Sequence, residues 1–246
     1  MRIALFGATG GIGRHLLTWA LAEGHDVHAL ARRPEQLAPA GAGPFSAGGA
    51  LAPAAGRLAP AAGGLAPAAG RLAPAAGGLT VTAGDALDPL AVAAVVTGAD
   101  VVLSALGPRG PRGTRTPSLL ARSAANLVAA MDQAGVRRLI SMSAAGAFIT
   151  GDPDTGWLIK AIIPRVFAVP FADVREMEAA IRASDLSWTL VRASRLVNRP
   201  ATGQYRVRAD YPPPGGRKIA RADVAHFMAL ALTEDAWRNA APAPAY

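Results

Sequence analysis

Residues 2–13 read RIALFGATGGIG, and this stretch decides the fold. An apolar run over residues 2–6 ends in a turn with glycine at positions 7, 10 and 13, and apolar residues then recur at helical spacing from Leu16 to Leu21. The run predicts a buried parallel strand, and the spacing predicts a helix that stops at Gly24. Between a strand and a helix, three glycines at these positions are typical of a dinucleotide-binding turn. The diphosphate of the dinucleotide would lie on the helix N-terminus.

Strand and helix patterns alternate along the rest of the chain. We expect further strands over residues 26–31, 79–82, 100–106, 138–143 and 188–192, and helices over residues 90–97, 118–133, 171–184 and 222–232. Strands that alternate with helices form a parallel sheet with right-handed crossovers. The sequence therefore predicts an α/β fold with a doubly wound parallel sheet of the Rossmann type, as a single domain over residues 1–246. Residues 240–246, rich in proline and alanine, are expected to form a loose tail.

A repeat interrupts this pattern. Residues 51–78 consist of four heptapeptides, LAPAAGR and LAPAAGG in alternation. Proline in every repeat excludes a coiled coil, and one leucine per seven residues cannot build a core. We interpret residues 40–78 as a disordered or surface-loop insertion, with a lid or docking arm as the alternative.

Composition excludes several classes of site. The chain has 246 residues, a net charge of +8 and no cysteine. Disulfides, thiolate metal sites and cysteine nucleophiles are therefore excluded, and we expect a cytoplasmic protein. The histidines lack metal-ligand spacing, so no metal is assigned. The arginines are dispersed, and the longest apolar stretch, residues 157–172, is interrupted by charges and prolines. We therefore expect no nucleic-acid or membrane partner, and a monomer or homodimer.

The end of the second strand indicates which dinucleotide binds. An acidic residue at this place would bind the ribose hydroxyls of NAD, but Arg32 and Arg33 stand there. Arginine can bind the 2′-phosphate of NADP through paired hydrogen bonds, so NADP(H) is the expected cofactor, with Arg32 as the principal contact. Asp85, after the third strand, is expected near the adenine. The turns after the fourth and fifth strands should line the same crevice, and the predicted cofactor-binding residues are Gly7, Thr9, Gly10, Gly11, Ile12, Gly13, Arg32, Arg33, Asp85, Ala105, Leu106, Gly107, Ser143 and Arg192.

Several segments resemble one known family. They are the glycine turn at residues 7–13, Gly84-Asp85, the stretch from Glu178 to Arg192, residues 201–207 and residues 219–228. Together they resemble the atypical short-chain dehydrogenase/reductase superfamily, in its NAD(P)H-binding, NmrA-like group, and within that group the biliverdin and flavin reductases. The resemblance covers nearly the whole chain except about residues 38–78.

The resemblance implies an NADPH-dependent reductase that transfers hydride to a planar small molecule such as a flavin, a tetrapyrrole or a quinone. Typical short-chain dehydrogenases use a Tyr-x-x-x-Lys pair, which this chain lacks, since neither Lys160 nor Lys218 follows a tyrosine at that spacing. The resemblance instead suggests Ser143 and Glu178 as catalytic residues. Ser143 would orient the nicotinamide or the substrate, and Glu178 would relay a proton or be a solvated carboxylate on a helix face.

Two other functions stay open at this point. One is a redox sensor that binds NADP(H) without turnover, and the other is a biosynthetic reductase or epimerase. Trp157, Phe167 and Phe171 could line an apolar substrate pocket in the biosynthetic enzyme, or could pack in the core.

Overall fold

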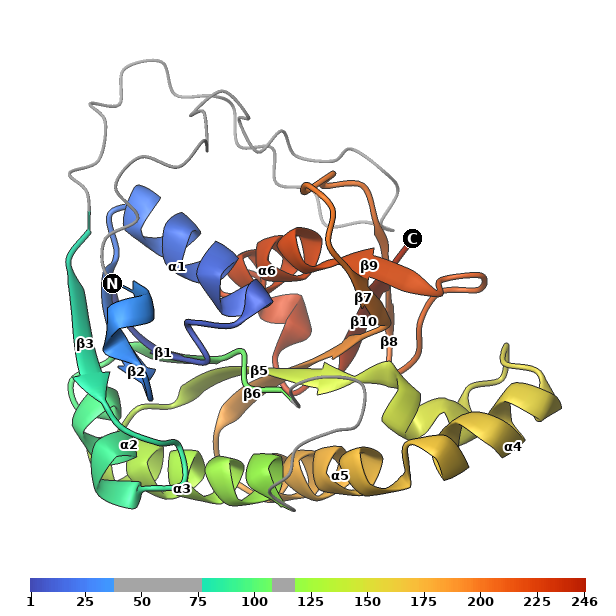
Figure 1. Cartoon of the computed structure of the whole chain (residues 1–246), viewed down its shortest axis with the longest axis horizontal. Coiled ribbons are helices and arrows are strands. Elements are labelled where there is room, and N and C mark those ends of the chain that lie inside the picture. Colours follow the sequence, from blue (N-terminus) through green and yellow to red (C-terminus); the bar gives the residue numbers. More distant parts are fainter. Residues whose placement is uncertain (38–76, 108–117) are drawn as a thin grey trace.

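The central sheet has six parallel strands in the order β3-β2-β1-β4-β5-β6 (Figure 1). The computed structural model describes residues 1–37, 77–107 and 118–246. The strands of the sheet are β1 (Arg2–Phe6), β2 (Asp26–Ala31), β3 (Leu79–Ala83), β4 (Val101–Ser104), β5 (Arg138–Ala144) and β6 (Ser187–Ala193). The order reverses between β1 and β4, which is the arrangement of a doubly wound Rossmann sheet. The predicted fold class is confirmed.

Helices cover both faces of the sheet (Figure 1). One face carries α1 (Gly11–Ala22) and α6 (Arg221–Leu230), and the other carries α2 (Pro89–Val96), α3 (Leu119–Ala134) and α5 (Ala168–Arg182). The remaining helices are α4 (Trp157–Val166) and the 3₁₀ turns η1 (Pro34–Leu37), η2 (Ala145–Gly151) and η3 (Asp235–Trp237). Helix α5 begins three residues before the predicted start because Pro170 lies in its first turn, where proline removes no helical hydrogen bond.

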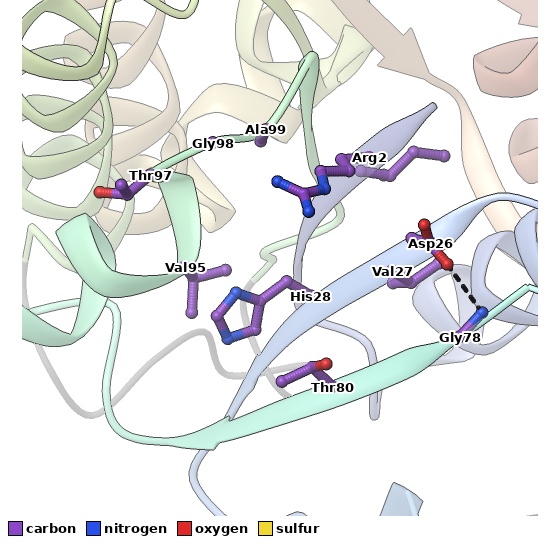
Figure 2. Close-up of a pocket in the computed structure, with 11 residues that line it drawn as sticks. Arg2, Asp26, Val27, His28, Gly78, Thr80, Val95, Thr97, Gly98 and Ala99 are labelled. Carbon is purple, nitrogen blue, oxygen red and sulfur yellow. Dashed lines mark hydrogen bonds between the residues drawn. The ribbon is translucent and has the colours of Figure 1, made fainter.

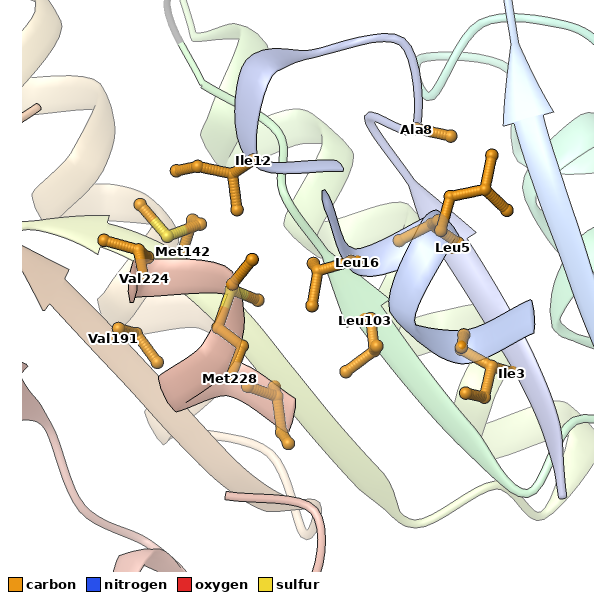
Figure 3. Close-up of a cluster of buried hydrophobic side chains, with 14 of the residues drawn as sticks. Ile3, Leu5, Ala8, Ile12, Leu16, Leu103, Met142, Val191, Val224 and Met228 are labelled. Atoms are coloured by element: carbon orange, nitrogen blue, oxygen red, sulfur yellow. The ribbon is translucent and has the colours of Figure 1, made fainter. Parts of the chain in front are cut away.

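Alternate residues of β1, β2, β4, β5 and β6 enter two separate apolar cores. In β1, Ile3 and Leu5 pack on the side of α1 and α6, whereas Ala4 and Phe6 pack on the side of α2, α3 and α5. Figure 3 shows the first core, in which Leu16 of α1 lies close to side chains from β1, β4 and α6. Burial on both faces explains why these strands are continuous apolar runs in the sequence.

Helix α3 receives its N-terminal cap from another helix. Ser118, the residue before α3, makes no side-chain cap. Instead, the buried carboxylate of Asp173 in α5 accepts hydrogen bonds from the backbone N–H groups of Leu120 and Ala121, both at 2.9 Å. This carboxylate occupies the positive end of the α3 dipole and fixes α5 against α3.

Two small sheets follow the central one. Strands β7 (Arg195–Val197) and β9 (Lys218–Ala220) pair in parallel, and β8 (Arg206–Ala209) and β10 (Pro242–Ala245) pair antiparallel. None of these four strands was predicted from the sequence pattern, because three- and four-residue strands have too few residues to show a period.

The prediction of a loose C-terminal tail is wrong. Residues 242–245 form β10, and Ala241, Ala243 and Ala245 are fully buried. The backbone of this segment also contacts β6, since the N–H of Leu190 donates to the carbonyl oxygen of Ala240 at 3.0 Å. Alternating alanines are small enough to let the segment approach the sheet closely, and an edge strand tolerates proline because it needs fewer N–H donors.

The repeat insertion predicted over residues 40–78 lies outside the described residues, except for Gly77 and Gly78. The backbone N–H of Gly78 donates to the Asp26 carboxylate at 3.0 Å, directly before β3 begins. Within residues 1–37, 77–107 and 118–246, no helix is long and apolar enough to cross a bilayer.

Candidate functional site

The glycine turn between β1 and α1 has a geometry that requires glycine. Gly7 has a φ of +79°, and its carbonyl oxygen accepts the N–H of Gly10 at 2.9 Å. A β carbon on Gly13 would lie 2.1 Å from that same carbonyl oxygen, so only glycine lets α1 approach the strand. Gly10, the N-cap residue of α1, offers no side-chain cap. The turn therefore leaves backbone N–H groups at the positive end of a helix, which fits the diphosphate of a dinucleotide.

The neighbouring turn packs directly on the glycines. The N–H of Ala105, the first residue after β4, donates to the carbonyl oxygen of Phe6 at 2.9 Å, and a β carbon on Gly7 would lie 2.7 Å from the Ala105 oxygen. Leu106 is partly buried in the core on the α3 side, and Gly107 is exposed. The structure thus brings the first and fourth predicted turns together at the point where the strand order reverses.

Arg32 and Asp85 lie side by side at the ends of β2 and β3. Their side chains are 54% and 40% exposed, and Arg32 Nη1 lies 3.8 Å from Asp85 Oδ2. The carboxylate is held in turn by the backbone N–H of Leu87 at 3.1 Å. Arg33, which follows Arg32 in the chain, is also exposed. Two exposed arginines and the Asp85 carboxylate therefore lie at the predicted place of the adenosine ribose.

A buried polar cluster lies at the ends of β5 and β6, and we call it the Ser143 cluster (Ser143, Glu178, Arg192). Ser143 and Arg192 are register partners on the two strands, and Glu178 reaches them from α5. The Ser143 hydroxyl donates to Glu178 Oε1 at 2.5 Å, and the Arg192 guanidinium donates to both carboxylate oxygens, at 3.0 and 2.7 Å. All three residues are buried. The paired hydrogen bonds compensate for the loss of water around the two charges.

Three residues outside the predicted set complete the surroundings of this cluster. The Arg192 guanidinium lies 3.6 Å from the centre of the Phe148 ring, and its Nη1 donates to the carbonyl oxygen of Asp210 at 2.9 Å. Arg182, one turn after Glu178 on α5, donates to its carboxylate at 3.4 Å. The spacing of Glu178 and Arg182 could have indicated that pair, whereas Phe148 and Asp210 meet the cluster only through the fold.

The interpretation of Glu178 as a solvated carboxylate on a helix face is wrong. Glu178 is 2% exposed, and both of its oxygens accept hydrogen bonds from Arg192. The helix presents this face to the ends of β5 and β6 rather than to solvent. The Nε, Nη1 and Nη2 atoms of Arg192 all donate hydrogen bonds within the protein. The contact of Arg192 with a cofactor stays a prediction.

Two of the three aromatic residues considered for a substrate pocket pack on each other. Trp157 begins α4 and is 79% exposed. Phe167 and Phe171 stack on each other at 5.4 Å between ring centres, and Phe171 packs against Gly146 of η2. The phenylalanines therefore join α5 to η2, while Trp157 lies on the surface.

A surface cavity of about 290 Å³ lies at the opposite edge of the sheet (Figure 2). It is lined by Arg2, Asp26, His28 and Gly98, among others, near the amino ends of β1, β2 and β3. Ligands of open α/β sheets bind outside the carboxyl ends of the strands, where the glycine turn lies. We therefore place the candidate cofactor site at the carboxyl edge and not in this cavity.

Within the described part of the chain, no group of three histidine, aspartate or glutamate side chains could hold a metal ion. The His28 ring is paired with the hydroxyl of Thr82 at 2.8 Å across β2 and β3, and partial burial lowers its pKa. Its position indicates a role in joining two strands.

Comparison with known proteins agrees with this geometry. ChuY, an anaerobilin reductase from Escherichia coli O157:H7, has 21% sequence identity and a TM-score of 0.70, over 100% of this chain and 97% of that chain. A short-chain dehydrogenase/reductase from Veillonella parvula, solved in complex with NADP, has 17% identity and a TM-score of 0.69, over 100% and 94% of the two chains. An oxidoreductase from Lactococcus lactis has 17% identity and a TM-score of 0.69, over 100% and 90%. At these identities the likeness shows the fold.

The family is shown by sequence. The model of the NAD(P)H-binding family matches residues 7–47 and 63–235, which is most of the chain and includes the glycine turn, Arg32, Asp85 and the Ser143 cluster. With the turn geometry and the strand order described above, this match identifies the chain as a member of the NAD(P)H-binding family.

Proposed function

We propose that this protein is an NADPH-dependent reductase that transfers hydride to a planar acceptor such as a flavin, a tetrapyrrole or a quinone-like compound. The observation that carries the proposal is the Ser143 cluster. It sets one oriented hydroxyl at the carboxyl end of β5, in the sheet edge that also holds the glycine turn. NADPH, when bound, supplies the hydride.

The Ser143 cluster can orient a ligand without being a strong acid. The Ser143 hydroxyl donates its hydrogen bond to Glu178. The hydroxyl oxygen therefore has lone pairs left to accept a hydrogen bond from an amide or hydroxyl of the ligand. Arg192 fixes Glu178 and prevents it from turning away. Hydride transfer between two stacked planar systems depends mainly on such positioning, and protonation of the acceptor can come from solvent.

Two of the three tyrosines have hydroxyl groups that are paired with other side chains of the fold. The chain has tyrosine only at positions 205, 211 and 246. The Tyr205 hydroxyl is paired with His226 at 2.7 Å, and the Tyr246 hydroxyl is paired with Asp223. Burial raises the pKa of Tyr205, which makes it a weaker acid than an exposed tyrosine. These two tyrosines therefore have structural partners in the C-terminal part of the fold.

The choice of NADPH rests on Arg32. Its guanidinium lies at the end of β2 beside Asp85, half-exposed and able to form paired hydrogen bonds with a phosphate. The relatives ChuY and the Veillonella parvula enzyme are described as an anaerobilin reductase and as a complex with NADP, which is consistent with this proposal.

Absorbance at 340 nm tests the proposal directly. The purified protein would be mixed with NADPH and, in separate reactions, with FMN, biliverdin and a short-chain quinone. We expect NADPH oxidation with at least one acceptor and a slower reaction with NADH. Cofactor binding without oxidation in the presence of any of these acceptors would contradict the proposal and favour a sensor that binds NADP(H) without turnover.

A further inference from the structure

Arg221, the first residue of α6, packs against the glycine turn. A β carbon built on Gly11 would lie 2.6 Å from Cδ and 3.1 Å from Nε of Arg221. Gly11 is not one of the three glycines that the turn between strand and helix requires. Its lack of a side chain instead makes room for the Arg221 stem, so the guanidinium lies over the first turn of α1.

The two short strands β7 and β9 fix Arg221 in this place. They pair in parallel with Val197 opposite Ala220, so the residues that follow, Asn198 and Arg221, emerge next to each other. Arg221 Nη1 donates to Asn198 Oδ1 at 2.6 Å. Asn198 is neutral, and among the described residues no carboxylate forms a salt bridge with Arg221. Its positive charge is therefore held in position without being neutralised.

The surroundings of Arg221 are electropositive. Helix α1 begins at Gly11 without a side-chain cap, so its first N–H groups and the positive end of its dipole lie beside the guanidinium. Asp223, the acidic residue in the first turn of α6, is fully buried and points its carboxylate to the backbone N–H groups of Thr202 and Gly203. The Asp223 carboxylate therefore binds the loop at residues 202–203 and not Arg221. The positive charge of the Arg221 guanidinium next to Gly11 is available to a ligand.

We propose that Arg221 binds the diphosphate of the dinucleotide, on the side opposite the N–H groups of α1. This inference rests on cofactor binding, the part of the proposed function that family membership supports, and not on reductase activity. A diphosphate carries two negative charges, and a guanidinium and a helix N-terminus are both suited to it. Because NADPH and NADH contain the same diphosphate, Arg221 contributes affinity without selecting between them, whereas Arg32 is proposed to select.

The test is equilibrium binding measured by cofactor fluorescence, which does not depend on turnover. Arg221→Met keeps an unbranched apolar stem over Gly11 but removes the charge. We expect its Kd for NADPH and for NADH to rise by the same factor, about tenfold to a hundredfold, as for a lost hydrogen bond to a charged group. ADP-ribose, which retains the diphosphate, should lose affinity by a similar factor. A matched control is Arg206→Met, since Arg206 is an exposed arginine on β8 whose guanidinium donates to the Pro214 carbonyl oxygen.

Two results would overturn the inference. One is an unchanged Kd for both cofactors in an Arg221→Met protein whose thermal unfolding midpoint matches the parent. The other is a loss for NADPH alone, which would place Arg221 at the 2′-phosphate. If the parent protein binds both cofactors but reduces no acceptor, the proposed reductase activity fails while the Arg221 inference stands on its binding data.

Discussion

Arg192 and Glu178 form a bidentate ion pair in the interior of the protein, with Nε 3.0 Å from Oε1 and Nη2 2.7 Å from Oε2. Their side chains are 6% and 2% exposed, so neither charge has more than marginal access to water. The pair joins β6 to α5 and thereby fixes the helix that carries Glu178 at the end of the sheet.

Removal of one partner of this pair should destabilise the fold strongly. Arg192→Met leaves the Glu178 carboxylate buried without its main partner, and we expect a loss of about 3–5 kcal/mol in the free energy of unfolding. The double variant Arg192→Met with Glu178→Gln should recover part of that loss because the unpaired charge is gone. Urea unfolding measures both, and a cost below about 1 kcal/mol for Arg192→Met would show that the pair is not formed.

Ser143 should affect the reaction more than the binding of cofactor. We expect Ser143→Ala to lower kcat/KM for NADPH oxidation about 10- to 100-fold, because the ligand loses the group that orients it. Ser141→Ala, two residues earlier on β5, is the matched control, since that buried hydroxyl donates to the neighbouring carbonyl oxygen of Met142. Equal rates for Ser143→Ala and the parent would remove Ser143 from the site.

Cofactor selectivity should depend on Arg32. Arg32→Ala is expected to weaken NADPH by about 1–3 kcal/mol, since a charged hydrogen-bond partner of the 2′-phosphate is lost, and to leave NADH nearly unchanged. Titration of both cofactors by fluorescence gives the ratio of the two Kd values. The exposed Arg137→Ala, whose guanidinium pairs with Asp132 outside the predicted cofactor site, is the control. Equal affinity of the parent for NADPH and NADH would refute the assignment of Arg32.

Loss of the α3 cap should lower the free energy of unfolding. Asp173→Ala removes the acceptor of two backbone N–H groups in a buried position, and we expect a loss of about 1–3 kcal/mol in the free energy of unfolding. Asp132→Ala, near the end of the same helix with an exposed carboxylate paired to Arg137, should cost less than about 1 kcal/mol. Equal losses for the two variants would contradict the capping role.

Stability should fall as the solution is acidified below neutral pH. Burial lowers the pKa of His15, His25, His28 and His226 below the ordinary value of 6.5. The unfolded chain therefore takes up protons near pH 6.5 that the folded chain binds only at lower pH, so the free energy of unfolding decreases as the pH falls through this window.

His226 offers a specific check of this pH dependence. His226→Asn can keep a hydrogen bond to the Tyr205 hydroxyl but cannot be protonated. Urea unfolding at pH 7.5, 6.5 and 5.5 should show a shallower decrease for this variant, by at most about 1.4 kcal/mol per pH unit. A slope identical to that of the parent would mean that His226 titrates alike in the folded and unfolded states.

The sequence by itself determined the fold class, the alternation of strands and helices and the glycine turn. These features depend on local chemistry, because a buried parallel strand needs a continuous apolar run, and Gly7 and Gly13 must accept a positive φ and a close backbone contact that no other residue tolerates. The sequence also placed Arg32 and Asp85 shortly after the second and third strands. Because these two strands are neighbours in the sheet, the two side chains lie close together.

Only the tertiary structure decided which groups meet across long separations. The sequence could not show that Glu178 is buried against Arg192, that Asp173 caps a helix 53 positions away, or that Arg221 lies on Gly11. The C-terminal strand was missed for the same reason, since alternating proline and alanine has no pattern of its own until β8 and β6 supply its partners. Local sequence patterns determine which secondary structure each segment can form. The free energy of burying a charge or a small side chain depends instead on neighbouring groups, and only tertiary packing brings those groups close.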